Sequence, residues 1–243
     1  MLYLHSLETF GVHDGPGIRL VIFLQGCNFR CLYCQNPDTQ PLKSDKARMM
    51  SIEEILDRLE RAKPYFKDSG GLTASGGEPS LQAKELTKLF KEAQKAGFHT
   101  ALDTAGTVFS DDIKKLYKYT DLVMLDVKHI DERWHRKITG ASNKSVLKCT
   151  AYRESTVKTM WLRYVLVPGW TDQPKFLKKW AQTFKNYKSV EKVEILPYHT
   201  LGVYKYEGLG RKYGLEGVPP ANPEDCKKTK KIFDQYFKNV IIK

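Results

Sequence analysis

The sequence of 243 residues carries 40 Lys and Arg against 28 Asp and Glu, a formal net charge of +12. Hydrophobic residues make up 41% of it and charged residues 28%, a balance that excludes a largely disordered or fibrous chain. No apolar run reaches the roughly 18 to 20 residues that cross a bilayer, and residues 1–10 lack the apolar stretch of a signal peptide. We therefore expect a soluble cytoplasmic protein with no membrane partner, folded as a single domain over residues 1–243.

Short apolar, β-branched runs alternate with longer amphipathic stretches along the chain. The runs predict strands at residues 20–25, 71–74, 98–102, 122–125, 160–167, 193–196 and 240–242. The amphipathic stretches predict helices at residues 51–66, 80–96, 110–119, 142–154, 173–187 and 223–238. Ser51 followed by Glu54 has the signature of a capping box, and Gly97 suits a helix C-terminus. This alternation predicts parallel βαβ units, with residues 200–222 as a loop over one end of the sheet.

Polar groups follow the predicted strands at their carboxyl ends. They are Cys27, the Ser75-Gly76-Gly77-Glu78 turn, Asp103 with Thr104, Asp126 with Lys128, and His199. Because ligands bind at this edge of parallel α/β sheets, we expect one shared site. The carboxylates suit an amine, a ribose hydroxyl or a small cation, and Lys128 suits a ligand carboxylate. Taken singly, each residue is as well explained as a cap or a solvated side chain.

Three of the five cysteines, Cys27, Cys31 and Cys34, fall within eight residues, whereas Cys149 and Cys226 stand alone and are expected to be small apolar helix residues. A close cluster of this kind in a cytoplasmic protein is typical of metal or redox chemistry. A structural zinc site uses four protein ligands, while three cysteines can hold a 4Fe–4S cluster and leave one iron open to a ligand. Zinc, or one buried face of a helix, remains an alternative.

The positive charge is spread over lysines in the predicted helices, without an Arg-rich tail. Composition therefore does not favour nucleic acid as a partner. An acidic partner or cofactor, or a solvated lysine-rich surface, accounts for the excess equally well.

The run Cys27-Asn-Phe-Arg-Cys31-Leu-Tyr-Cys34 resembles the CxxxCxxC signature of the radical S-adenosylmethionine (SAM) superfamily. Within it, the chain resembles the activating enzymes of glycyl radical enzymes, of the type that acts on pyruvate formate-lyase. The motifs that carry this resemblance occur in order over nearly the whole chain: Asp14-Gly-Pro-Gly-Ile-Arg19, Thr73-Ala-Ser-Gly-Gly-Glu78, Leu102-Asp-Thr104, Asp121-Leu-Val-Met-Leu-Asp126, Arg163-Tyr164, Val167-Pro-Gly-Trp170 and Leu196-Pro-Tyr-His199. Residues 35–74 contain no Cys where other activating enzymes carry a ferredoxin-like insert, which favours the pyruvate formate-lyase type. Gln35 and Ala105 stand where some relatives have His and Asn.

The resemblance implies a partial (β/α)6 TIM-like barrel with its site at the carboxyl ends of the strands. It implies a 4Fe–4S cluster on Cys27, Cys31 and Cys34. It assigns SAM contacts to Tyr33, Cys34, Gln35, Gly76, Gly77, Glu78, Asp103, Asp126, Val127, Lys128, Arg163 and His199. It assigns a monovalent cation, Na⁺ or K⁺, to Asp103, Thr104, Met124 and Asp126, and contact with the partner's glycine loop to Asp14, Gly15, Pro16, Gly17, Ile18 and Arg19.

The resemblance also implies anaerobic chemistry in which a reduced cluster cleaves SAM and the resulting 5′-deoxyadenosyl radical takes hydrogen from a glycine of pyruvate formate-lyase. Protein side chains then position SAM and need not act as acid or base. We expect a monomer that receives electrons from flavodoxin or ferredoxin. Two other readings remain: a SAM enzyme acting on a nucleobase or RNA, and an iron–sulfur electron carrier or zinc module without SAM chemistry.

Overall fold

The computed structural model describes residues 1–243, which form two compact units. Unit 1 comprises Met1–Asn28 and Thr39–Met124, and unit 2 comprises Phe29–Asp38 and Leu125–Lys243. The expected single domain stays a prediction, and each unit is described by itself. None of the helices combines the length and the apolar character that a bilayer crossing requires.

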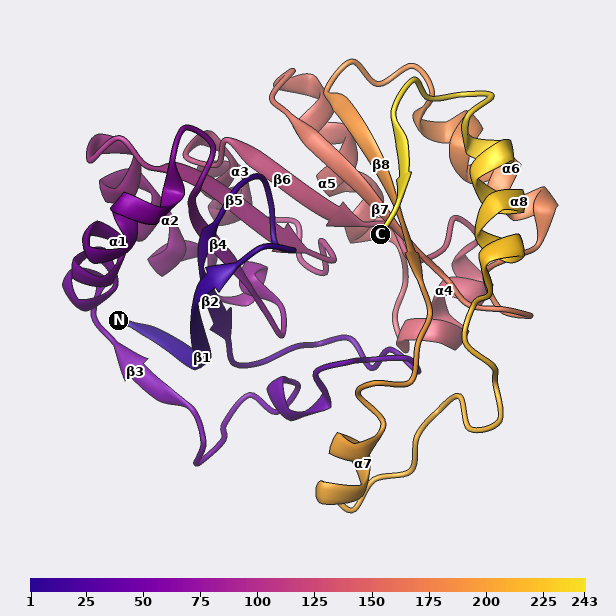
Figure 1. Ribbon diagram of the computed structural model, residues 1–243, viewed down its shortest axis with the longest axis horizontal. Helices are drawn as coiled ribbons and strands as arrows, with labels where there is room; N and C mark the ends of the chain where they lie inside the picture. Colours follow the sequence, from indigo (N-terminus) through magenta and orange to yellow (C-terminus); the bar gives the residue numbers. More distant parts are fainter. The chain divides into compact units, whose positions relative to one another are not determined.

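Unit 1 contains five strands, in the order β3-β1-β2-β4-β5 (Figure 1). Their bounds are β1 Leu2–Gly11, β2 Arg19–Leu24, β3 Arg48–Met50, β4 Gly71–Gly76 and β5 His99–Thr104. The strands β2, β4 and β5 are parallel, whereas β1 pairs antiparallel with both β2 and β3. The helices are α1 Ile52–Phe66, η2 Pro79–Gln82, α2 Ala83–Lys95 and α3 Asp111–Lys118. The predicted Ser51–Glu54 capping box is present at α1 and satisfies two backbone donors of its first turn.

Residues alternate between two faces of the parallel strands in unit 1. Leu20, Ile22 and Leu72 are fully buried on the face that α1 and α2 cover. The opposite face carries residues in register across β2, β4 and β5. Its three layers are Arg19 with Gly71 and His99, Val21 with Thr73 and Ala101, and Phe23 with Ser75 and then Asp103. Such layers of alternating side chains are those of a (β/α) barrel interior.

Unit 2 contains the parallel strands β7 Met160–Leu166, β8 Val190–Pro197 and β9 Val240–Ile242. Its helices are α4 Glu132–Thr139, α5 Lys144–Ser155, α6 Pro174–Phe184, α7 Tyr204–Gly208 and α8 Pro223–Phe233. The helices α6 and α8 lie side by side (Figure 1). Trp180 of α6 stacks on Phe233 of α8 and meets Tyr164 of β7 edge-on, so aromatic rings join these helices to the strands. The strand β6 (Leu122–Asp126) and η1 (Pro37–Thr39) carry the chain through the unit boundary.

The predicted strands and helices are all present, with ends that differ by a few residues. The predicted α/β class with parallel strands is confirmed, and the sheet is not closed because β3 pairs only with β1 and β9 only with β8. Five elements were not predicted: β1, η1, β3, α4 and α7. The prediction that residues 200–222 form only a loop is wrong, since α7 lies within them.

Candidate functional site

In unit 1, the chain that leaves β2 toward Cys27 is joined to the Gly-Gly-Glu turn after β4. The amide of Gly77 donates to the Leu24 carbonyl at 2.9 Å, and the amide of Glu78 donates to the Gly26 carbonyl at 2.8 Å. A Cβ on Gly77 would overlap that Gly26 oxygen, so only glycine permits this approach. The structure thus brings the first cysteine and the predicted glycine turn together.

Glu78 organises the turn through its side chain. One carboxylate oxygen accepts from the Thr104 hydroxyl at 2.5 Å and the Ser80 amide at 2.9 Å, and the other accepts from the Ala105 amide at 2.9 Å. Burial raises the pKa of Glu78 above its usual value, although these donors oppose the rise. Only 1% of Glu78 is exposed, so a ligand at the turn would meet backbone groups of Gly76 and Gly77.

In unit 2, the loop with Cys31 and Cys34 is held by the end of α4. The amide of Arg30 donates to the Thr139 carbonyl at 2.8 Å, and the amide of Leu32 donates to the Ile138 carbonyl at 2.9 Å. These carbonyls have no partner inside the helix, so the cysteine loop satisfies them. No predicted element covered this support, although Asp131 caps α4 at its start and Gly140 ends it in the left-handed conformation.

The segment after β8 packs against the same loop. The Gln35 side chain donates to the His199 carbonyl at 3.1 Å and accepts from the Gly202 amide at 2.8 Å, which joins two predicted SAM residues. The Tyr206 hydroxyl donates to the Cys34 carbonyl at 3.1 Å, a contact that the sequence analysis also missed. Tyr33, Cys31 and Cys34 pack in one cluster with Tyr198, Tyr206 and Tyr213.

Asp126, at the end of β6, lies between two cations in unit 2. Lys128 Nζ lies 2.8 Å from Asp126 Oδ2, and Arg163 Nε lies 3.4 Å from Asp126 Oδ1. Burial raises the pKa of Asp126, but these two cations lower it by more, so it lies below the usual value. Burial lowers the pKa of Lys128 while Asp126 raises it, and the net result is well above the usual range. The pair is therefore ionised at neutral pH.

The remaining predicted cofactor and cation residues are distributed as follows. In unit 1, Asp103 Oδ2 accepts from the Ser75 hydroxyl at 2.9 Å, and Met124 is fully buried. In unit 2, Val127 is buried, and its amide and carbonyl bond Arg163 and Trp180. Thr104 lies in unit 1 and Asp126 in unit 2, so the monovalent-cation site stays a prediction.

The motif Asp14–Arg19 lies in unit 1 between β1 and β2. The Asp14 carbonyl accepts from the Thr73 hydroxyl at 2.7 Å, and a Cβ on Gly15 would lie 3.7 Å from Ala101 Cβ. The loop therefore rests on the middle layer of side chains, directly below Ser75 and Asp103. Arg19 is fully buried, so its guanidinium anchors the loop and offers no surface to a partner. The predicted contact of the partner's glycine loop with Asp14, Gly15, Pro16, Gly17, Ile18 and Arg19 stays a prediction.

The residues present fit the cofactors that the cysteine motif implies. The five cysteines form no disulfide, and Cys27, Cys31 and Cys34 are only partly buried, so three thiolates are available to iron. In unit 2, the Tyr33 hydroxyl and Asp126 Oδ1 are buried without a hydrogen bond, which marks polar positions that a bound ligand would satisfy. No three His, Cys, Asp or Glu side chains are gathered in a metal-ligating arrangement, so the cluster assignment rests on donor chemistry and spacing.

His135 supports the cysteine loop in unit 2, and it makes the fold sensitive to acid. Its ring meets Phe29 edge-on at 5.4 Å, its Nδ1 lies 2.7 Å from the Ala141 carbonyl oxygen, and its Nε2 is buried without a hydrogen bond. Burial lowers the pKa of His135 to about 4. In the unfolded chain this imidazole takes up a proton near pH 6.5, whereas in the folded protein it stays neutral down to about pH 4. The contribution of neutral His135 to the free energy of unfolding is therefore complete above pH 6.5 and is lost as the pH falls toward 4.

We expect the free energy of unfolding to fall by on the order of 2 kcal/mol between pH 6.5 and 5 through this group. In His135→Gln this pH-dependent part should vanish, whereas the exposed His13→Gln should keep it. Urea unfolding at several pH values measures the difference. Equal pH slopes in wild type and His135→Gln would contradict the role of His135.

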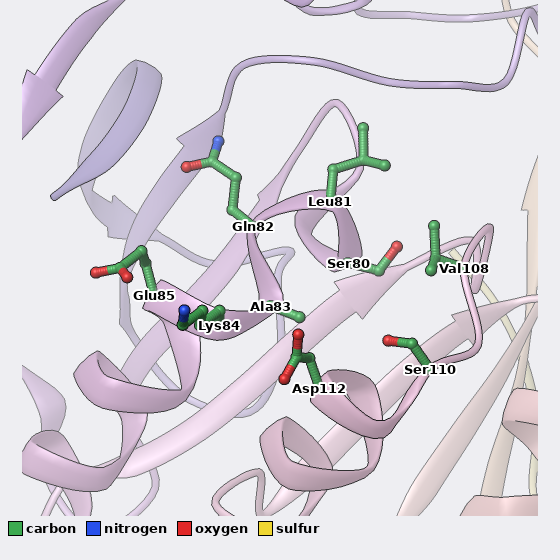
Figure 2. A pocket seen from close by; sticks show the side chains of 9 residues that line it. All are labelled: Ser80, Leu81, Gln82, Ala83, Lys84, Glu85, Val108, Ser110 and Asp112. Carbon is green, nitrogen blue, oxygen red and sulfur yellow. The ribbon is translucent and has the colours of Figure 1, made fainter.

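Two grooves lie beside the predicted site residues. The first, of about 440 Å³, lies in unit 1 between η2, the start of α2 and the segment before α3; Figure 2 shows Ser80, Ser110 and Asp112 among its lining side chains. The second, of about 470 Å³, lies in unit 2 and includes Tyr206, Arg211 and Tyr213. None of the predicted site residues lines either groove.

Comparison with known proteins agrees with this geometry. Residues 21–181 match the model of the radical SAM superfamily. The chain is 43% identical over 247 residues to a pyruvate formate-lyase-activating enzyme of Streptococcus mutans, covering 97% of this chain and 94% of that one. It is 45% identical over 232 residues to the enzyme of that name from Staphylococcus epidermidis, covering 93% and 92%.

Solved structures share the fold. A domain of a pyruvate-formate lyase-activating enzyme from Bacteroides vulgatus aligns with a TM-score of 0.60 at 22% identity, over 72% of this chain and 99% of that one. Streptococcus suis SuiB bound to S-adenosylmethionine aligns with a TM-score of 0.69 at 15% identity, over 95% and 51%. These neighbours and the open parallel sheet confirm the predicted partial barrel. The chain belongs to the radical SAM superfamily and, within it, to the family of pyruvate formate-lyase-activating enzymes.

Proposed function

We propose that this enzyme activates a pyruvate formate-lyase by generating a glycyl radical on it under anaerobic conditions in the cytoplasm. The observation that carries the proposal is the Cys27-x3-Cys31-x2-Cys34 run in a member of this family, with Cys27 next to Gly26, whose carbonyl accepts from the Glu78 amide of the glycine turn in unit 1. When bound, a reduced 4Fe–4S cluster supplies one electron that cleaves SAM to methionine and a radical able to take hydrogen from glycine.

The side chains of this protein bind and orient. Cys27, Cys31 and Cys34 would hold the cluster, and backbone groups of Gly76 and Gly77 would meet the methionyl end of SAM. In unit 2, Lys128 and Arg163 provide positive charge for a ligand carboxylate and Asp126 provides a buried negative charge for its amine. Tyr33, Cys34, Gln35, Val127 and His199 would complete the SAM pocket, with Glu78 and Asp103 shaping it.

The proposed function also includes a bound monovalent cation, a protein electron donor and a monomeric enzyme. Na⁺ or K⁺ would bind Asp103, Thr104, Met124 and Asp126, because carboxylate, hydroxyl and backbone carbonyl oxygens suit a hard cation. Flavodoxin or ferredoxin would supply the electron, and the enzyme would act as a monomer. The excess of twelve positive charges supports association with an acidic protein donor.

The test combines the reconstituted protein, dithionite, SAM and pyruvate formate-lyase without oxygen, followed by electron paramagnetic resonance. We expect a glycyl-radical doublet and one 5′-deoxyadenosine for each radical formed. A partner variant in which the target glycine is replaced by alanine is the matched control and should give no doublet.

The same measurement separates the alternative readings. Cleavage of SAM without a radical on the partner would favour a SAM enzyme that acts on another substrate, such as a nucleobase or RNA. Intact SAM in the presence of a reducible cluster would favour an iron–sulfur electron carrier, and a zinc content without iron would favour a structural module.

A further inference from the structure

Six charged side chains form a row in unit 2 that begins at the end of β6 and crosses β7 and β8. In order of contact they are Lys128, Asp126, Arg163, Glu194, Lys192 and Lys243. Arg163 joins its two halves, because its Nε lies 3.4 Å from Asp126 Oδ1 and 3.9 Å from Glu194 Oε2. Arg163 and Glu194 occupy matching positions of the parallel β7–β8 pair. The strands themselves therefore hold Glu194 against a predicted SAM residue.

Glu194 is the most deeply buried charge of this row, with only 1% of its side chain exposed. Lys192 Nζ lies 3.0 Å from Glu194 Oε1, and Lys243 Nζ lies 3.9 Å from the same oxygen. Lys192 is in turn held over the ring of Trp161, 3.2 Å from its centroid. No hydrogen bond of good geometry reaches either oxygen of Glu194, so its contacts are the ion pairs with Lys192, Lys243 and Arg163.

Stability does not explain a carboxylate in this position. A buried ion pair is commonly no more stabilising than apolar residues of the same volume, since each charge loses its hydration. Glu194 belongs to none of the sequence motifs, and its side chain is too buried to serve a surface partner. We therefore look for the role of the Glu194 charge in ligand binding beside Arg163.

The explanation lies in the balance of charge along the row. The row brings four cations, Lys128, Arg163, Lys192 and Lys243, against two carboxylates, Asp126 and Glu194. The cations suit the carboxylate of SAM and oppose its sulfonium and ammonium groups. Removing Glu194 would take one negative charge from this row, so a cationic ligand would meet stronger repulsion.

We propose that Glu194 is a positioning residue that keeps Arg163 turned toward Asp126 and lowers the positive charge of this wall, so that the site accepts a cationic sulfonium. The inference rests on the proposed function, because it assumes that SAM binds beside Arg163. It identifies Glu194 as the residue that favours SAM over S-adenosylhomocysteine, which lacks one methyl group and the positive charge of the sulfonium.

The measurement is the dissociation constant of each ligand for the reconstituted, unreduced protein, obtained by equilibrium dialysis with no turnover. In Glu194→Gln we expect SAM to bind about tenfold more weakly, the factor for one unit charge acting over roughly 10 Å at an effective dielectric constant near 20. S-adenosylhomocysteine should weaken by less than about threefold, because it carries no net charge. Glu194→Asp keeps the charge and should keep most of the wild-type ratio.

Lys192→Met changes the charge in the opposite direction. It keeps an apolar stem over Trp161 and removes a cation beside Glu194. In Lys192→Met the affinity for SAM relative to that for S-adenosylhomocysteine should rise about threefold. Lys192→Met also tests the inference if Glu194→Gln does not fold, and an unchanged or lowered ratio in it overturns the inference. Equal losses for both ligands in Glu194→Gln, or no loss at all, also overturn it and leave the proposed function standing. Failure of the wild-type protein to bind SAM overturns both.

Discussion

Replacing Cys31 with alanine is expected to abolish SAM cleavage, a loss greater than the roughly 10- to 100-fold that replacing an outer-shell partner of a metal ligand costs. Three thiolates are the fewest that hold a 4Fe–4S cluster while leaving one iron for an outside ligand, so two cannot keep both properties. The backbone supports of the loop should survive, because Leu32 is bound to Ile138 through its amide and Cys31 accepts from Cys34 through its carbonyl. The change thus removes a ligand without removing the loop.

Iron and sulfide content, the 5′-deoxyadenosine yield and the melting temperature together measure this effect. Cys149→Ala is the matched control, because Cys149 lies buried in α5 with 1% exposure, away from the loop. It should lose about 1 kcal/mol of stability and keep the cluster and the activity. A Cys31→Ala protein that retains a normal cluster and cleaves SAM would contradict the ligand assignment.

Periodicity predicted the elements whose burial is one-sided or complete. The parallel strands are short apolar runs, and the helices carry clear caps, as at Ser51 and Ser110. Periodicity missed elements that bury few apolar side chains. Residues 6–10 of β1 are largely exposed, and α4 has eight residues of which most are charged or polar. For α4 the signals were present in Asp131 and Gly140, whereas α7 has no side-chain cap.

Motifs predicted which residues lie at the carboxyl ends of the strands but not what each side chain contacts there. The SAM contact of Glu78 stays a prediction, and the motif did not show that its carboxylate holds the turn to Thr104 and Ala105. Glu194 belongs to no motif; its signal was the spacing of Lys192 and Glu194 on one face of a buried strand, where charges are rare. Such roles depend on which strands become neighbours, and that follows from topology rather than from local sequence.

Replacing Arg19 with methionine is expected to remove about 3 to 5 kcal/mol from the free energy of unfolding. Its Nε donates to Thr73 Oγ1 at 2.9 Å, its Nη2 donates to the Leu72 carbonyl at 2.6 Å, and its Nη1 lies 3.1 Å from His99 Nδ1. Burial lowers the pKa of Arg19 to about 10, so it remains charged at neutral pH. Methionine would leave the buried acceptors without donors. Lysine keeps the charge but cannot reach several acceptors at once, so Arg19→Lys should lose less.

Comparing Asp14→Ala with Arg19→Met distinguishes contact with the partner from support of the loop. Asp14 contacts Thr73 through its backbone carbonyl, which alanine keeps, and its carboxylate opposes the lowering of the Arg19 pKa by burial. Removing that carboxylate should cost on the order of 1 kcal/mol, less than the loss expected for Arg19→Met. We expect Asp14→Ala to cleave SAM at the wild-type rate and to yield little glycyl radical, since the carboxylate would serve the partner's loop. Urea unfolding measures the stability of each variant, and the yields of 5′-deoxyadenosine and of glycyl radical measure SAM cleavage and radical transfer separately. A stable Arg19→Met protein that fails only in radical transfer would return Arg19 to the partner surface and overturn its role as an anchor.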